Sequence, residues 1–166
     1  MNKNGFEIER KFLIKYPDIS LLLKNSLCRE LKMEQTYLNG GARVRKIEEN
    51  GKVSFIKTVK KHITDIKREE KEWQISEEEY IKELENKAES TSTIKKTRYA
   101  FPLDNLVLEI DVFSFWNDRA FLEIELENEE QKILLPEFLE VIKEVTFDKR
   151  YNNSSLAREV VTEDIN

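Results

Sequence analysis

The sequence predicts a strand-rich α+β domain in which antiparallel strands outnumber helices. Charged and apolar residues alternate over eight short segments, as they do in strands with one apolar face. Turn signals separate neighbouring segments. Asn50-Gly51 is the clearest, because an Asn-Gly pair between two alternating runs favours a hairpin. The chain has 166 residues and no internal linker or repeat, so we assign residues 1–166 to a single domain.

The eight alternating segments are expected to be the strands. They cover residues 6–14, 34–38, 42–48, 52–60, 67–75, 94–103, 106–113 and 119–128. Further turn signals stand at Asn39-Gly40-Gly41 and Asp104-Asn105. Because most of the connections are short, neighbouring strands are expected to be antiparallel.

Helices are expected at residues 18–32, 76–87 and 137–145, and in a short segment that begins at Ser154 or Ser155. Leucines at helical spacing predict the first helix. Ser76 and Glu79 form a capping-box pattern that opens the second helix. Pro136 suits the first position of the third helix, where a missing N–H costs nothing.

The composition excludes several classes of protein. Charged residues make up 37% of the chain and the net charge is −5, a mild acidity that argues against a nucleic-acid partner. No apolar run approaches the roughly 20 residues of a membrane span. The first residues carry charges throughout and lack the apolar core of a signal peptide. We therefore expect a cytoplasmic protein without a membrane partner, and leave open whether it is a monomer or a homodimer.

The first predicted strand carries the most informative motif, Glu7-Ile8-Glu9-Arg10-Lys11. Side chains two residues apart share one face of a strand, so Glu7, Glu9 and Lys11 lie side by side. Two adjacent carboxylates repel each other unless a cation lies between them, and Mg²⁺ takes oxygen ligands of this kind. Taken alone, the motif is equally consistent with a solvated strand face.

Pairs of like charge at alternate positions recur along the chain, and this favours a site over a solvated surface. These positions are Arg43, Arg45 and Lys57; Arg68, Glu70 and Glu72; Lys96 and Arg98; Glu109 and Asp111; and Glu123, Glu125 and Glu127. A closed or nearly closed antiparallel barrel would turn all these faces toward one lumen. Carboxylates there would hold Mg²⁺ or Mn²⁺, and the Arg and Lys side chains would hold a di- or triphosphate.

In their order along the chain, these motifs resemble the CYTH superfamily, the triphosphate tunnel metalloenzymes. The matching elements are Glu7-Ile8-Glu9-Arg10-Lys11, Gln35-Thr36-Tyr37-Leu38, Arg43-Val44-Arg45, Lys57, Glu70-Lys71-Glu72, Lys96-Thr97-Arg98-Tyr99, Glu109-Ile110-Asp111, Glu123-Ile124-Glu125-Leu126 and Arg150-Tyr151-Asn152-Asn153. Gln74 departs from the pattern of the compact bacterial members, in which another acid is expected. The resemblance implies an antiparallel eight-stranded β-barrel, a triphosphate tunnel, with helices packed on its outside.

The resemblance also implies roles for the charged residues. The expected metal ligands are Glu7, Glu9, Glu109, Asp111, Glu123 and Glu125. The expected phosphate-binding residues are Lys11, Arg43, Arg45, Lys57, Lys96, Arg98 and Arg150. The expected catalytic residues are Lys11, Arg43, Arg45, Lys57, Glu70, Glu72, Lys96 and Arg98. The roles of Lys11, Arg68 and Arg150 stay open. Lys11 could pair with an acid instead of phosphate, Arg150 could lie at the surface, and the basic Arg68 and Lys71 leave the register of their strand open.

The function implied by the resemblance is Mg²⁺- or Mn²⁺-dependent hydrolysis of a small-molecule triphosphate, with inorganic triphosphate expected first and nucleoside triphosphates as further substrates. Two alternatives belong to the same superfamily, an adenylate cyclase and a thiamine-triphosphatase. An alternative of another class is a non-catalytic polyphosphate-binding domain, which would need the cations and not the carboxylates. The sequence does not identify the physiological substrate or the number of metal ions.

Overall fold

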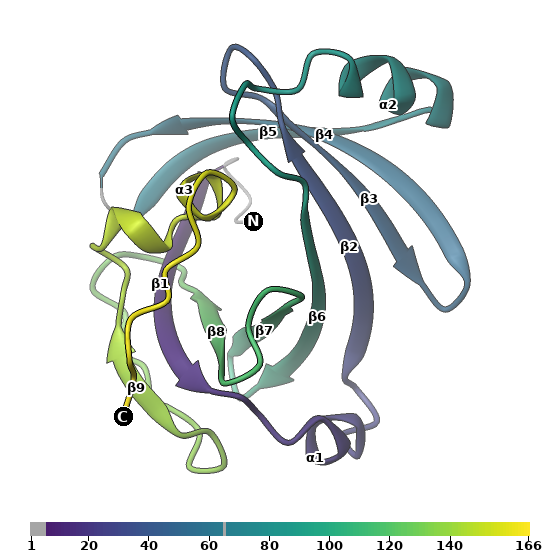
Figure 1. Ribbon diagram of the computed structural model, residues 1–166. Helices are drawn as coiled ribbons and strands as arrows, with labels where there is room; N and C mark the ends of the chain where they lie inside the picture. The colour runs from purple at the N-terminus through teal and green to yellow at the C-terminus, as the bar shows by residue number, and fades with distance from the viewer. Residues whose placement is uncertain (1–5, 65) are drawn as a thin grey trace.

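In residues 6–64 and 66–166, which the computed structural model describes, nine strands form one antiparallel sheet that curves into a ring (Figure 1). The strands are β1 (Phe6–Lys15), β2 (Arg29–Tyr37), β3 (Arg43–Glu49), β4 (Lys52–His62), β5 (Lys67–Ile75), β6 (Ile94–Leu103), β7 (Leu106–Phe113), β8 (Arg119–Glu125) and β9 (Val141–Glu144). Their order is β5-β4-β3-β2-β6-β7-β8-β1-β9, and β1 also pairs with β5. Eight strands therefore close the ring and β9 is added beside β1, which confirms the predicted eight-stranded antiparallel barrel.

The first strand closes the ring by dividing one of its edges between two partners. Its start pairs with β5 over three residues, Phe6 to Ile8, and its middle pairs with β9 over residues 12–14. Its other edge pairs with β8 from Glu9 to Lys15. The closing seam between β1 and β5 is thus short, and the carboxylates of β1 lie at it.

The hairpin expected at Asn50-Gly51 joins β3 to β4. Both turn residues have positive φ, 52° for Asn50 and 78° for Gly51. A two-residue turn of the type that matches the twist of a hairpin requires this conformation, which Asn and Gly adopt more readily than other residues.

The helices are shorter than predicted. They are α1 (Ile19–Leu23), α2 (Glu77–Leu84) and α3 (Asn153–Leu156), with a 3₁₀ turn η1 (Lys149–Tyr151) before α3. The helix predicted over residues 18–32 is wrong beyond Leu23, because the chain enters β2 at Arg29. Leu23 and Leu27 are 49% and 64% exposed, so the leucine stripe is not a buried helix face. Pairing of β2 with β3 and β6 outweighs the local helical spacing.

The helix predicted over residues 137–145 is also wrong, because Val141–Glu144 forms strand β9. This segment occupies the part of the β1 edge that β5 leaves uncovered. Glu144 lies opposite Phe12 in the ladder and forms an ion pair with Arg10. An unpaired strand edge offers backbone hydrogen bonds to any nearby extended segment. Here pairing with β1 makes residues 141–144 a strand.

The apolar face of the barrel wall points outward and is covered there. Ile8, Ile110 and Ile124 alternate with the charged residues of their strands and are at most 4% exposed. They pack with partly buried residues of the segment 133–141. Val44 of β3 packs instead against Tyr80 of α2. The cover thus comes from α2, β9 and the chain that leads into β9, and only in small part from α1.

Ser76 caps α2 as predicted, since its Oγ accepts a hydrogen bond from the Glu79 backbone N–H at 3.1 Å. The helix holds Tyr80 against Phe55, with ring centres 4.9 Å apart. We expect Ser76→Ala to lower the free energy of unfolding by about 1 kcal/mol, because the substitution leaves a helix N–H without its partner. Urea denaturation of the two proteins measures this difference. Ser155→Ala, in a helix without such a cap bond, is the control, and equal losses would contradict the capping role.

Candidate functional site

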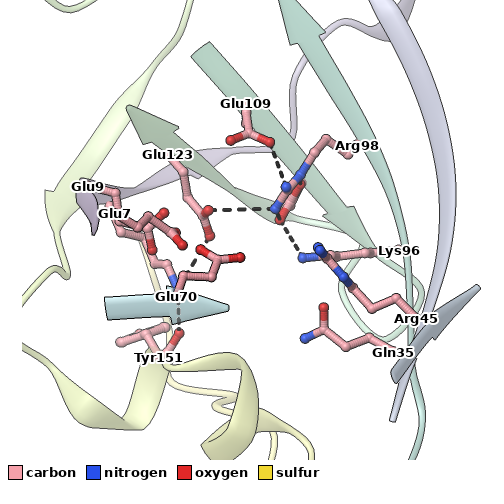
Figure 2. A network of polar contacts seen from close by, with 12 residues as sticks. Glu7, Glu9, Gln35, Arg45, Glu70, Lys96, Arg98, Glu109, Glu123 and Tyr151 are labelled. Atoms are coloured by element: carbon pink, nitrogen blue, oxygen red, sulfur yellow. Dashed lines mark hydrogen bonds and ion pairs between the residues drawn. The ribbon is translucent and has the colours of Figure 1, made fainter. Parts of the chain in front are cut away.

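The barrel encloses a cavity of about 670 Å³, and more than half of the residues that line it are charged. The charged residues that line it are Glu7, Glu9, Lys11, Arg43, Arg45, Lys60, Arg68, Glu70, Glu72, Lys96, Arg98, Glu109, Glu123, Glu125 and Arg158. Figure 2 shows several of them pointing toward one another from different strands. The structure therefore brings most of the predicted site residues together.

Carboxylates from three neighbouring strands form one side of this cavity. Glu9 of β1 lies directly opposite Glu125 of β8, and Glu123 of β8 lies directly opposite Glu109 of β7. Like charges opposite each other destabilise a sheet unless a cation offsets them. Burial raises the pKa of Glu109 to about 7, against the opposing effect of Arg98 and with the support of Glu123. Arg98 nevertheless forms ion pairs with both Glu109 and Glu123, so this side of the cavity holds opposed carboxylates together with a cation.

Lys96 and Arg98 of β6 are bound by Asp111, which lies behind the residues that line the cavity. Asp111 is fully buried and accepts hydrogen bonds from Lys96 Nζ at 2.7 Å and from Arg98 Nε at 2.7 Å. Burial lowers the pKa of Lys96 to about 8, although Asp111 opposes the shift. Burial also acts against the charged forms of Arg98 and Asp111, but their mutual attraction raises the pKa of Arg98 and lowers the pKa of Asp111. Asp111 thus orients two cations toward the cavity.

Two arginines of β3 present donors that have no partner. Arg45 is buried and its Nη2 lies 3.0 Å from Glu72 Oε2, but its Nε makes no hydrogen bond. The buried Nε of Arg43 also lacks a hydrogen-bond partner. Burial, reinforced by the charge of Arg43, lowers the pKa of Arg45 to about 9. Buried donors without acceptors are costly, and an anionic ligand in the cavity would satisfy them.

Ion pairs already occupy the carboxylates of the first strand. Lys60 Nζ lies 3.0 Å from Glu7 Oε2, and Arg68 Nη1 lies 2.8 Å from Glu9 Oε1. Burial disfavours ionised Glu7, but Lys60 and further hydrogen bonds outweigh it and lower the pKa of Glu7 to about 2. The Glu7 carboxylate is therefore held in the charged form.

Lys11 joins the charged cavity to an apolar cluster in the same barrel. Its Nζ lies 3.5 Å from Glu123 Oε1, 3.3 Å from the backbone oxygen of Tyr151, and 4.7 Å from the ring centre of Phe121. Phe121 packs there with Leu13, Phe113, Trp116 and Tyr151. The amine thus has an acid on one side and an apolar wall on the other, a setting in which its charge acts at low dielectric.

Three predicted site residues lie elsewhere, which corrects the sequence-based assignment. Lys57 points to the outside of β4, where its Nζ lies 2.6 Å from Glu83 of α2. Arg150 is at the surface and pairs with Asp148 and Glu163. Asp111 contacts the cations and does not line the cavity.

Sequence reasoning missed the inward role of Lys60. Thr58, which lies opposite Arg43, lines the cavity, so the even-numbered residues at the end of β4 face inward and Lys57 faces outward. Lys60 therefore takes the place expected for Lys57. Counting in steps of two from Thr58 to Lys60 and His62 would have given this result, once the register with Arg43 was known.

The donor set fits Mg²⁺ or Mn²⁺ in its chemistry. Both ions prefer carboxylate oxygens, and the opposed pairs Glu9/Glu125 and Glu109/Glu123 present such oxygens from neighbouring strands. In the part of the chain that the structure describes, no three acidic, His or Cys side chains stand close enough together to enclose a metal ion. The carboxylates are spread over several strands and engaged with Lys and Arg side chains, so their present arrangement is one of ion pairs.

The fold and the charged cavity place the chain among the triphosphate tunnel proteins, and comparison with known families agrees. The model of the CYTH domain matches residues 5–153, and the chain belongs to this family. A search of curated protein sequences found no significant match. Among residues 6–64 and 66–166, none of the helices has the length and apolar character needed to span a membrane.

Solved structures resemble the chain over most of its length. The inorganic triphosphatase NE1496 is 26% identical, with 92% of this chain and 94% of that chain covered and a TM-score of 0.55. Another structure, of the hypothetical protein NE1496, is 27% identical over 93% of this chain and 99% of that chain, with a TM-score of 0.57. The PH1819 protein from Pyrococcus horikoshii OT3 shares the fold at 21% identity, with 75% and 80% covered and a TM-score of 0.58.

Proposed function

We propose that this protein is a metal-dependent hydrolase of triphosphates that cleaves inorganic triphosphate to diphosphate and phosphate. One observation carries the proposal: carboxylates of β1, β7 and β8 share a cavity with arginines and lysines of β3, β4 and β6, and two of those arginines have unpaired buried donors. The 26% identity to an inorganic triphosphatase supports it.

The carboxylate side is the place for the metal. Glu9, Glu123 and Glu125 would hold Mg²⁺ or Mn²⁺, with Glu7 beside them and Glu109 facing Glu123. A bound ion of this kind supplies charge stabilisation at a phosphoryl oxygen. Glu70 and Glu72 line the same cavity and remain candidates for orienting the attacking water. Orientation matters more than basicity here, because phosphoryl transfer depends chiefly on positioning and charge.

The cationic side binds the phosphates. Arg43, Arg45 and Arg98 offer planar forks to phosphate oxygens, and Lys60 and Lys96 add point charges. Asp111 holds Lys96 and Arg98 in place through its three hydrogen bonds. These cations also offset the charge that develops on the leaving group.

The residues that line the cavity favour a triphosphate that carries no nucleobase. Tyr37 and His62 are the two aromatic side chains among the described residues that line the cavity, and the Tyr37 hydroxyl accepts a hydrogen bond from Gln35 at 2.8 Å. A nucleotide cyclase has to hold adenine, for which aromatic stacking is the usual device. We therefore place inorganic triphosphate ahead of ATP and thiamine triphosphate.

The test measures phosphate release from inorganic triphosphate, ATP and thiamine triphosphate, each with Mg²⁺, with Mn²⁺ or with chelator. We expect release from inorganic triphosphate with either metal and none with chelator. Lys60→Met should lower kcat/KM by about 10²-fold, since it removes a cation from the cavity. Lys57→Met, three residues away on the outer face, should leave it unchanged.

Other outcomes would favour a different function. Turnover that persists with chelator would exclude the metal. Cyclic AMP from ATP without matching phosphate would favour an adenylate cyclase, and thiamine triphosphate as the best substrate would favour a thiamine-triphosphatase. Tight binding of triphosphate without turnover would indicate a polyphosphate-binding domain.

A further inference from the structure

Two ion pairs cross the seam where the barrel closes. Lys60 of β4 reaches Glu7, and Arg68 of β5 reaches Glu9, at 3.0 and 2.8 Å. The seam has three residue pairs in its ladder, and one of them joins Glu7 to Arg68. The two pairs thus bind β5 and β4 to the same carboxylates that the proposed function gives to the metal.

We propose that Arg68 is the resident counter-cation of Glu9, which a divalent metal ion has to displace when it binds. This inference rests on the proposed function. Glu9 and Glu125 face each other directly, and the guanidinium of Arg68 offsets their repulsion in the protein without metal. Glu9 Oε1 already accepts a hydrogen bond from Arg68. A metal ion that binds this oxygen therefore has to break the ion pair between Glu9 and Arg68.

Arg68 suits this role better than Arg45, Lys96 and Arg98. Lys96 and Arg98 are tied to the fully buried Asp111, and Arg45 is tied to Glu72. Arg68 is paired with Glu9, and both side chains retain some exposure, 17% and 12%. A partly exposed pair exchanges partners at lower cost than a fully buried one.

A displaced Arg68 has a second partner available. It lines the same cavity as Arg43 and Arg45, so its freed guanidinium can bind a phosphate oxygen there. Metal and triphosphate should then strengthen each other's binding, because each favours the state in which Arg68 has left Glu9. Arg68 thereby restrains the binding of metal in the absence of substrate.

Calorimetric titration with Mn²⁺ alone tests the inference, without substrate and without turnover. Arg68→Gln should bind Mn²⁺ about tenfold more tightly than the wild type, which is the effect of removing roughly 1.4 kcal/mol of competition. Arg45→Gln is the matched control, since it removes the same charge from the same cavity and not the partner of Glu9. We expect it to change Mn²⁺ affinity by less than about threefold, the scale of a screened charge at longer range. An equal increase in Mn²⁺ affinity in both variants would show that the effect comes from the total charge of the cavity and not from the partner of Glu9. That result would overturn the proposal.

A measurement on the wild type covers the case in which Arg68→Gln does not fold. Mg²⁺ should shift the guanidinium NMR signal of Arg68, assigned by its absence in Arg68→Lys, and an unchanged signal at saturation would overturn the inference. The two proposals fail differently. Absence of Mn²⁺ binding in every variant would overturn the proposed metal dependence, whereas Mn²⁺ binding that is the same in the wild type and Arg68→Gln overturns the role of Arg68 alone.

Discussion

Glu123→Gln is expected to lower phosphate release from inorganic triphosphate by about 10²–10³-fold, the scale seen when one charge-stabilising group is removed from an active site. Glu123 is 5% exposed and lies where the two sides of the cavity meet. Its carboxylate is 3.5 Å from Lys11 and 3.6 Å from Arg98, and its strand neighbour across the ladder is Glu109. Glutamine keeps the shape and removes the charge that the metal requires.

Glu144→Gln is the control for this experiment. It makes the same change in a residue that also pairs with an arginine, Arg10, but lies on β9 outside the ring. Its kcat should stay within about twofold of the wild type, as is usual for surface positions away from a site. A loss in Glu144→Gln as large as in Glu123→Gln would show that charge on the protein as a whole, and not in the cavity, controls the rate.

Asp111→Asn should produce the largest loss of stability, about 3–5 kcal/mol in the free energy of unfolding. Asp111 is fully buried and is the common partner of Lys96 and Arg98. Without its charge, two buried cations face each other with less compensation. Urea denaturation followed by tryptophan fluorescence measures the effect.

Asp118→Asn provides the comparison, because Asp118 also pairs with an arginine, Arg119 Nε at 2.9 Å, but its side chain is 47% exposed. Solvent screens such a pair, so we expect a loss of at most about 1 kcal/mol. Similar losses in the two variants would mean that Asp111 has no special structural role. A stable Asp111→Asn protein that binds triphosphate normally would contradict its role in holding Lys96 and Arg98.

The features predicted correctly are those set by a few neighbouring residues. The alternation in Glu7, Glu9 and Lys11 gave both the strand and the face it presents to the cavity. Asn50-Gly51 gave the turn, because a positive φ is a property of these residue types. The same alternation in several strands was enough to predict a charged interior.

The errors concern features that distant residues decide. Lys57, Lys60 and Lys61 lie close together in the sequence, and which of them faces inward depends on the register of β4 with β3. Residues 141–144 become a strand because β1 offers them an edge, and nothing local in their sequence shows that edge. The pairing of Arg68 with Glu9 likewise exists only once β5 and β1 meet at the seam.

The position of the first strand has a consequence for how the chain folds. Phe6 meets its partner at Glu69, and Glu9 meets its partner at Glu125, 116 residues further along the chain. Such non-local pairings are costly in chain entropy and form slowly. The carboxylates of β1 therefore join those of β7 and β8 only when the ring closes. A chain that has folded only as far as its hairpins, β3–β4 and β6–β7, carries the cations of these strands but has no closed cavity in which they meet the carboxylates of β1 and β8.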